Sequence, residues 1–454
     1  MCYSEKKSLE VLFDDTKALE DDELYEESTR ERASDEVTLD RPDWAAPSVD
    51  DDVNDTFSKT FALSEKGNDI DIWRFRKDKM LNSSGSPAIK AVDSIYSSND
   101  SVQLFLIGQK NSYARLNINI TLFGYLMHKY RVFERFWDFV APFSVKSRES
   151  DIGHAPFRFH QSEPVVLESL MTDVKLGSFE CAYGFRYVEL NNRTTQVEED
   201  PDYDPWSVRQ TTVYQQYDSA HDRNVFFLIC PSQRVKQALK VALTRRAESN
   251  VPLNAFEMHR IVLCTLHDNW RAYLRSVEKE LANLSDKVTL TQVRSESERL
   301  SPLMDFTVNF IDRQKLKLIE DKILDLQIIF ESLQNTVAKM QRQCKVHCMA
   351  ERCKRCTCSS IVEELEEQRH EIDVNLKKSE TLLKRAQGTA HLLSDLLDYE
   401  NAQIAHHNEV SLNKLVQESK DENSRMRLLT QERSARDAAG KTFQKLPTIC
   451  SNFV

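Results

Sequence analysis

The sequence predicts an α+β (mixed α/β) fold, in which an N-terminal α/β domain with a small mixed sheet precedes long, coiled-coil-like stalk helices. Two observations carry this prediction. Between residues 102 and 230, short apolar segments alternate in the manner of β-strands. From residue 311 onward, apolar side chains recur every three or four residues, the spacing of helices packed in a left-handed coiled coil. Sheet is therefore expected first and helices last.

The N-terminal region is the most acidic part of the chain. Residues 1–55 hold 19 Asp and Glu against 6 Lys and Arg, whereas the remaining residues are close to neutral. Such a segment buries too little apolar surface to offset the entropy lost on ordering. We predict a largely disordered region at 1–95, serving solubility or, alternatively, attracting cations or a partner. An α/β domain at 96–250, a helical stalk at 251–439 and a short tail at 440–454 follow.

Within the α/β domain, the residues Val102–Ile107, ended by Gly108, predict a buried strand. Aromatic residues at helical spacing predict a core helix over 122–140, and polar tracts at 82–87 and 97–101 predict loops. Alternating segments between 156 and 230 predict strands, the last two forming a hairpin that turns at 218–223. Because the connections are short, we expect antiparallel pairing.

The segment DPWSVRQ at 204–210 predicts a turn followed by a strand. Asp204 and Pro205 favour the turn, and Trp206 would anchor the strand that follows. Arg209 is expected to stack on an aromatic ring or to pair with a carboxylate such as Glu189.

Helices are predicted at 232–248, 252–284, 311–345, 360–403 and 405–438. The third carries an apolar stripe, and a second stripe follows along the fourth and ends at Ile404. The first stripe consists of Leu316, Ile319, Ile323, Leu326, Phe330, Leu333, Val337 and Met340. The second consists of Leu383, Ala386, Ala390, Leu393, Leu397 and Ile404. We expect helices 311–345 and 360–403 to pack antiparallel around the segment between them.

That segment, the Cys-rich hinge at residues 344–358, predicts a zinc site. Six soft ligands lie within fifteen residues, and two of them have the C-x-x-C spacing of a zinc knuckle. The ligands are Cys344, His347, Cys348, Cys353, Cys356 and Cys358. The alternative is a hinge of reduced thiols, since Cys344 also continues the apolar stripe after Met340 and no second C-x-x-C follows.

Other functions find little support in the sequence. It contains no G-x-S-x-G, Walker A, G-x-G-x-x-G or kinase motif, and its histidines are scattered, so we expect no enzyme. The pair Arg245 and Arg246 lacks interleaved aromatic residues on an acidic chain, which argues against nucleic-acid binding. No secretory signal and no apolar run of about 20 residues occur, so we expect a cytoplasmic protein with reduced cysteines.

Four blocks together resemble the CorA-like transporter domain proteins of filamentous ascomycete fungi. They are FGYLMHKYRVFERFWDFVAPF at 123–143, RYVELNN at 186–192, DPWSVRQTTVYQQY at 204–217 and LLTQERSARDAA at 428–439. That family is distantly similar to the CorA magnesium channels. The resemblance implies a cytosolic α/β domain, a long stalk helix, two membrane helices with a Gly-Met-Asn loop, and Mg²⁺ as the transported or sensed ion.

The chain departs from that pattern near its C-terminus. Gly-Met-Asn does not occur, and residues 440–454 look like the edges of the first membrane helix joined across an absent apolar middle. A truncated gene model, a splice product and a soluble descendant would each give this sequence. The pore residues of the family therefore map to no position here.

We expect the cytosolic domain and stalk of a divalent metal-ion transporter relative, not competent to conduct alone. It would form a homo-oligomer, or pair with a coiled-coil partner, through its stalk helices. It would be membrane-associated only if a longer form or a partner supplied the membrane helices. The alternatives are a soluble coiled-coil interaction protein and a scaffold organised by zinc at the hinge.

Overall fold

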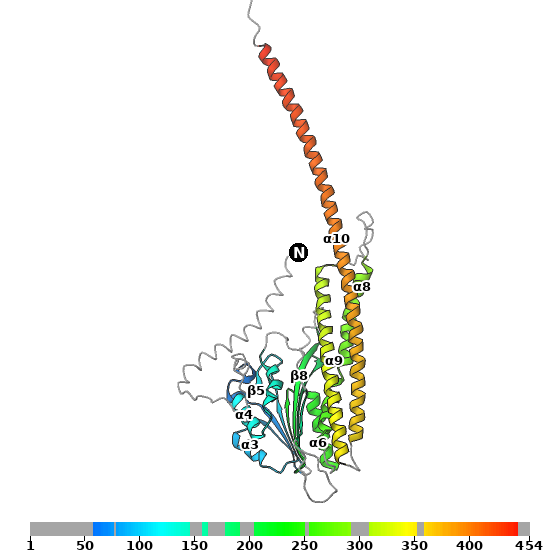
Figure 1. Ribbon diagram of the computed structural model, residues 1–454. Helices are drawn as coiled ribbons and strands as arrows, with labels where there is room; N and C mark the ends of the chain where they lie inside the picture. Colours follow the sequence, from blue (N-terminus) through cyan, green and yellow to red (C-terminus); the bar gives the residue numbers. More distant parts are fainter. Residues whose placement is uncertain are drawn as a thin grey trace, which may run out of the picture.

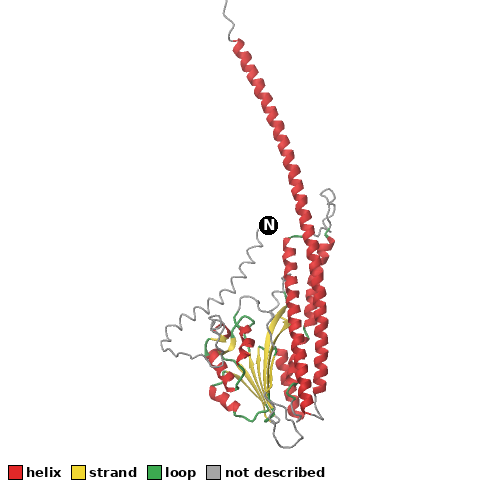
Figure 2. Cartoon of the chain, viewed as in Figure 1, coloured by secondary structure: helices red, strands yellow, loops and turns green. Residues whose placement is uncertain are grey.

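The computed structural model describes residues 58–76, 79–145, 157–161, 178–190, 204–249, 254–291, 308–351 and 358–443. A mixed sheet separates two helical layers (Figure 1). Short helices cover one face, and the longer helices that follow the sheet cover the other (Figure 2). Because successive side chains of a strand point to opposite faces, β4 supplies Leu104 and Leu106 to one core and Phe105 and Ile107 to the other. The predicted mixed α/β fold followed by long helices is confirmed.

The main sheet has seven strands in the order β3-β2-β4-β9-β8-β7-β6. Its β4 and β9 pair in parallel, while its other neighbours pair antiparallel. The strands are β2 Ile70–Arg76, β3 Lys79–Gly85, β4 Val102–Ile107, β6 Arg158–Gln161, β7 Phe179–Leu190, β8 Trp206–Asp218 and β9 Arg223–Ile229. A second, two-stranded sheet pairs β1 Phe61–Ala62 with β5 Leu116–Asn119.

Two strand predictions are confirmed in detail. The strand predicted at Val102–Ile107 is β4, buried along its whole length. The predicted hairpin is β8–β9, whose register brings Asp218 opposite Arg223 at the turn.

The N-terminal layer begins earlier than the sequence indicated. Strands β2 and β3 lie before residue 96, where the domain was predicted to start, and helix α3 Ile89–Tyr96 ends there. The polar tract predicted as a loop at 82–87 supplies the end of β3. As an edge strand β3 tolerates such polar residues, because much of it remains exposed to water.

The single helix predicted over 122–140 is wrong. Helix α4 Ile120–Lys129 starts where the Asn119 side chain accepts a hydrogen bond from the Leu122 amide at 2.9 Å. It ends before Arg131, whose φ of 49° is left-handed and cannot continue a helix. The short turns η2 Glu134–Phe136, α5 Trp137–Val140 and η3 Ala141–Phe143 follow, and they still bury their aromatic residues as predicted.

The C-terminal helices differ from the prediction in two ways: one predicted helix is divided into two, and two predicted helices form one. They are α6 Gln233–Ser249, α7 Glu257–His267, α8 Trp270–Leu290, α9 Phe310–Glu351 and α10 Cys358–Phe443. The helix predicted at 252–284 divides at Asn269, whose side-chain amide donates to the Val188 carbonyl of β7 at 2.8 Å. The helices predicted at 360–403 and 405–438 are one helix, because no residue near 404 interrupts the hydrogen-bond ladder.

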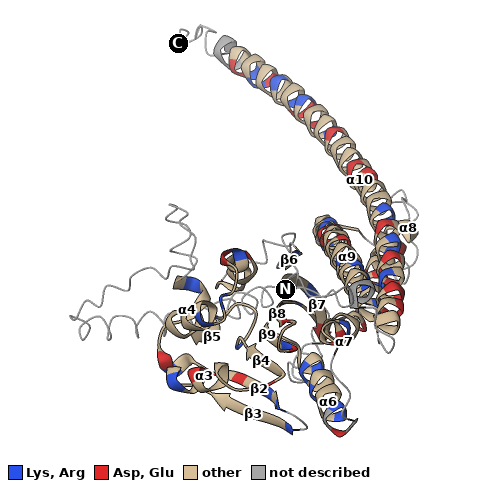
Figure 3. Ribbon diagram, turned by 60° about the horizontal axis from the view of Figure 1, so that its bottom comes forward, with Lys and Arg blue, Asp and Glu red and all other residues tan. Residues whose placement is uncertain are grey.

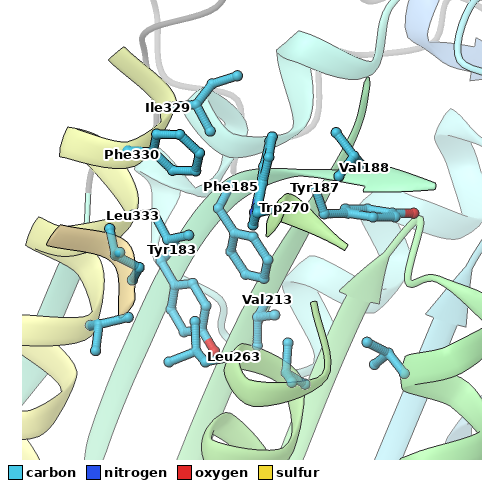
Figure 4. Packing of buried hydrophobic residues seen from close by; sticks show 14 of the residues in the cluster. Tyr183, Phe185, Tyr187, Val188, Val213, Leu263, Trp270, Ile329, Phe330 and Leu333 are labelled. Carbon is cyan, nitrogen blue, oxygen red and sulfur yellow. The ribbon is translucent and has the colours of Figure 1, made fainter. Parts of the chain in front are cut away.

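Helices α8, α9 and the first part of α10 form an up-down-up bundle against the sheet (Figure 1). All eight residues of the first apolar stripe are buried, so their partners are other helices and strands of the same chain. Phe330 packs edge-on against Trp270 of α8, with ring centres 5.0 Å apart (Figure 4). Helices α9 and α10 meet antiparallel along this bundle, as predicted.

Candidate functional site

Helix α10 has two parts with different surroundings. Its 86 residues span about 130 Å at 1.5 Å per residue. Up to Leu397 it packs against α8 and α9, whereas every residue described from 398 to 439 is exposed. We call residues 398–439 the protruding segment. It extends well past the bundle (Figure 1).

The protruding segment carries both charges and unpartnered apolar surface. Lys, Arg, Asp and Glu are interspersed along it (Figure 3). Nine large hydrophobic side chains are exposed there: Tyr399, Ile404, Val410, Leu412, Leu415, Val416, Met426, Leu428 and Leu429. Ile404, predicted to close the second stripe, is 53% exposed, so that stripe stops contacting the bundle before it. Across the described part of the chain, no helix combines the length and apolar character needed to span a bilayer.

The Cys-rich hinge connects the end of α9 to the start of α10, at the end of the bundle opposite the protruding segment (Figure 1). Three of its six predicted ligands have described side chains, and all three are buried: Cys344, His347 and Cys358. Cys348 lies on α9, but its side chain falls outside the described part, as do Cys353 and Cys356 altogether.

The described hinge residues have contacts with the body of the protein. Cys344 joins the buried seam of α9, as the alternative interpretation expected. The His347 imidazole packs edge-on against the rings of Phe179, Tyr217 and Phe256, 5.2–5.9 Å away between centres. Cys358 lies 3.1 Å from the Asn254 side-chain amide. Within the described ranges no three His, Cys, Asp or Glu side chains are grouped as metal ligands, and the zinc site stays a prediction.

A second cluster of reactive residue types is fully buried between β7, β8 and α7. His259 Nε2 donates to Gln215 Oε1 at 2.5 Å, and its Nδ1 accepts from Tyr183 Oη at 2.8 Å in the neutral ring. Cys181 Sγ lies 3.6 Å from Nε2. Burial lowers the pKa of His259 to about 3 and raises the pKa of the Cys181 thiol. Both groups are therefore neutral at pH 7. Gln215 also donates to Asn224 and to the Ala255 carbonyl, so the cluster is a satisfied polar network that ties α7 to the sheet.

The segment at 204–210 behaves as the sequence predicted. Asp204 Oδ1 accepts from the Trp206 amide at 3.0 Å, and Trp206 starts β8 and packs against Tyr273 of α8. Arg209 pairs with Glu189 at 3.5 Å. Arg186 of β7 and Lys236 of α6 line the same cavity as Arg209 and Glu189. No sequence pattern indicated this, because it depends on strand register and on the packing of α6.

A family model described as CorA-like transporters matches residues 48–289, slightly more than half of the chain. The chain belongs to the CorA-like family. The match starts within the region predicted as disordered and ends in α8, so α9 and α10 follow the matched part. Membership of a transporter family, and not an enzyme family, implies a non-catalytic role.

Comparison with solved structures finds only distant similarities. The cytoplasmic domain of ZntB from Vibrio parahaemolyticus is 11% identical with a TM-score of 0.38, over 74% of this chain and 99% of that one. The soluble domain of CorA from Methanocaldococcus jannaschii is 10% identical with a TM-score of 0.37, over 72% and 97%. Full-length CmaX is 11% identical with a TM-score of 0.44, over 76% and 82%. No curated protein matches this chain in sequence. The family assignment therefore rests on the family model that matches residues 48–289.

Proposed function

We propose that this CorA-like chain is the body and stalk of a divalent metal-ion transporter relative of the magnesium type, and that it self-associates through α10. We also propose that the chain is one of the CorA-like proteins of filamentous ascomycete fungi, which its four sequence blocks resemble. The chain would not conduct ions alone, and membrane helices from a longer form or a partner would complete the pore.

The observation that carries this proposal is the protruding segment of α10. An isolated helix in water is only marginally stable, and most helical stability in proteins comes from packing of an apolar face. The protruding segment has exposed apolar side chains at Leu412, Leu415, Met426 and Leu429, spaced three, eleven and three residues apart. This spacing places them along one stripe of a coiled coil, which a second copy of the chain could cover.

Self-association can be tested by light scattering on the full chain. Leu412→Asp with Leu415→Asp places two charges on the stripe, and we expect it to shift the mass from oligomer toward monomer. Asn413→Asp adds one charge on a different face of the same turn and should leave the mass unchanged. A monomeric wild-type chain, or equal effects of both variants, would contradict assembly through this stripe.

Ion transport needs a separate measurement. Cells expressing the chain alone should show no more uptake of Mg²⁺ than cells without it, because the described helices cannot span a bilayer. Uptake by the chain alone would overturn this part of the proposal. Self-association without uptake, even when a family member with membrane helices is co-expressed, would favour the alternative of a coiled-coil interaction protein.

A further inference from the structure

The exposed apolar stripe of the protruding segment consists of two groups with the same internal spacing. Leu412 and Leu415 form the first group, and Met426 and Leu429 repeat it two heptads later. In a heptad written abcdefg, Leu412 and Met426 then occupy a positions, and Leu415 and Leu429 occupy d positions. All four side chains are 61–64% exposed, so the body of the protein does not cover them. The stripe is therefore available to a second helix.

The heptad between the two groups is polar at both of its seam positions, with Ser419 at a and Glu422 at d. In a parallel, in-register pair of helices, Glu422 would face the partner's Glu422 across the seam, and two juxtaposed carboxylates repel each other. In an antiparallel pair, an a position faces a d position. Ser419 then faces the partner's Glu422, whose carboxylate can accept a hydrogen bond from the hydroxyl. The polar heptad therefore favours the antiparallel orientation.

The apolar groups match in the antiparallel orientation as well. With the two-fold axis between residues 420 and 421, Leu412 faces the partner's Leu429. In the same register, Leu415 faces the partner's Met426. The spacing of three, eleven and three residues reads the same in both directions, so each apolar side chain meets an apolar side chain and none meets a charge.

The charges beside the seam distinguish the two orientations. Glu418 and Arg425 occupy g positions, and both are exposed among the mixed charges of the segment (Figure 3). In an antiparallel pair g positions lie side by side, so Glu418 meets the partner's Arg425, and the two-fold axis repeats the contact. In a parallel pair a g position meets an e position instead, and the partner's Asn423 and Thr430 carry no charge. Since ion pairs between such flanking positions set the orientation of coiled coils, the charges also favour the antiparallel pair.

We propose that the protruding segment pairs antiparallel with the same segment of a second copy of this chain. The inference rests on the proposed self-association through α10 and adds the orientation of the two copies. Helix α10 ends at Phe443, which in this register lies level with the partner's residue 398, so the two segments overlap along their whole length.

This pairing places the two bodies at opposite ends of the paired segments. The ends of the two bundles, at residue 397 of each chain, would lie about 70 Å apart at 1.5 Å per residue. Two stalks that run in opposite directions cannot both lead toward one membrane. The antiparallel pair therefore agrees with a chain that does not conduct ions alone, and it excludes a parallel assembly of the same two stalks.

The test is sedimentation of the full chain and of charge-reversal variants over a range of concentrations. The wild-type chain should reach the mass of two chains. Glu418→Arg brings arginine beside arginine at both contacts, and Arg425→Glu brings glutamate beside glutamate. Each variant should raise the dissociation constant of the pair about tenfold, because two ion pairs are replaced by two repulsions.

Mixing the two variants provides the sharpest readout. An equimolar mixture of Glu418→Arg and Arg425→Glu should pair as tightly as the wild type, because arginine then meets glutamate at both contacts. Each chain keeps its own substitution, so recovery on mixing cannot come from the stability of a single helix. Arg427→Glu is the matched control. It reverses the same charge two residues from Arg425, at a b position away from the seam, and should leave the dissociation constant unchanged.

The possible outcomes separate this inference from the proposed self-association. If the wild type pairs but both reversals leave its dissociation constant unchanged, or if mixing restores nothing, the antiparallel orientation is wrong and self-association stands. An equal loss in Arg427→Glu would also overturn the orientation, since pairing would then reflect the overall charge of the segment. A monomeric wild type would overturn both. Small-angle X-ray scattering of the pair gives an independent check, because bundles that lie side by side would contradict the antiparallel arrangement.

Discussion

The two parts of α10 belong to one uninterrupted helix and have opposite surroundings. In the packed part, Ile361, Leu365, Ile372 and Leu393 are at most 1% exposed. In the protruding segment, Leu412, Leu415, Leu428 and Leu429 are all more than 60% exposed. Leucine side chains at helical spacing are thus core residues in one part and bare surface in the other.

An apolar stripe on a helix therefore indicates that the helix packs against a partner, but it does not indicate where that partner lies. The stripe of α9 finds its partners within the chain, on α8, α10 and β7. Within the protruding segment the side-chain bonds described are local, such as Ser424 to the Lys420 carbonyl and Thr430 to the Met426 carbonyl. Such bonds do not replace tertiary burial, so substitutions should act differently in the two parts.

The largest difference in the free energy of unfolding is expected between the variants Phe330→Asp and Leu415→Asp. Phe330 is fully buried against Trp270, and the variant would leave both a cavity and an unpaired buried charge. We expect a loss of unfolding free energy on the order of 3–5 kcal/mol. Leu415→Asp should leave the stability of the body within about 0.5 kcal/mol, as at other surface positions. Urea denaturation measures both, and an unchanged midpoint in Phe330→Asp would mean that the bundle does not depend on this seam.

An element of the fold could be predicted where its sequence pattern lies within one short segment. Periodicity within one segment was enough for β4, for the β8–β9 hairpin and for the stripe of α9. The break after α4 was missed because it depends on one left-handed residue, Arg131, inside an aromatic pattern that otherwise continues. Strand β2 did carry a signal in the alternation Ile70-Asp-Ile-Trp-Arg-Phe-Arg76, but the acidic segment before it obscured that signal.

The candidate site was less predictable than the fold. The Arg209–Glu189 pair could be anticipated from two strands close in sequence. Arg186 and Lys236 line the same cavity only because β9 ends before β8 does and α6 follows it there. The hinge shows the opposite case. Its cysteines are adjacent in sequence, yet sequence proximity does not determine whether side chains on two helices converge on a metal.

A smaller contrast should appear in the dependence of stability on pH. The folded pKa of His259 is about 3, against an ordinary value of 6.5, because the ring is fully buried. Below pH 6.5 the unfolded chain takes up a proton that the folded chain does not, so stability falls as pH falls from about 6.5 toward 3. His259 alone contributes a slope of about 1.4 kcal/mol per pH unit. His267, whose pKa burial lowers to about 4, adds a similar slope between about pH 6.5 and 4.

The protruding segment supplies the control for this prediction. His406 and His407 are exposed there, and His406→Gln with His407→Gln should leave the slope unchanged. His259→Gln should be less stable at pH 7 and show a shallower slope between pH 6.5 and 5. If urea midpoints in His259→Gln fall as steeply as in the wild type, another group governs the acid sensitivity of the body.

The Cys-rich hinge between α9 and α10 allows a test of the zinc prediction. If the hinge holds zinc, the purified chain should carry about one equivalent, and Cys353→Ser with Cys356→Ser should remove it. Cys264→Ser, on α7, is the matched control and should keep the metal. Helices α9 and α10 already meet along the bundle, so metal loss should destabilise the protein less than the buried-charge variant does. Elemental analysis that finds no metal in protein purified without chelator would leave reduced thiols.

The smallest effect is expected for an ion pair on the surface of the packed part. Lys378 of α10 donates to Glu278 of α8 at 2.7 Å, but both side chains are about 40% exposed. Water and salt screen such a pair, and holding two long side chains costs entropy, so a double-mutant cycle with Lys378→Met and Glu278→Gln should give a coupling of about 0.2–1 kcal/mol. Lys414→Met in the protruding segment provides the comparison, and we expect no loss of body stability there. A coupling well above 1 kcal/mol would mean that α10 is held to α8 by charge as much as by its buried seam, and the two parts of α10 would then differ in electrostatics as well as in burial.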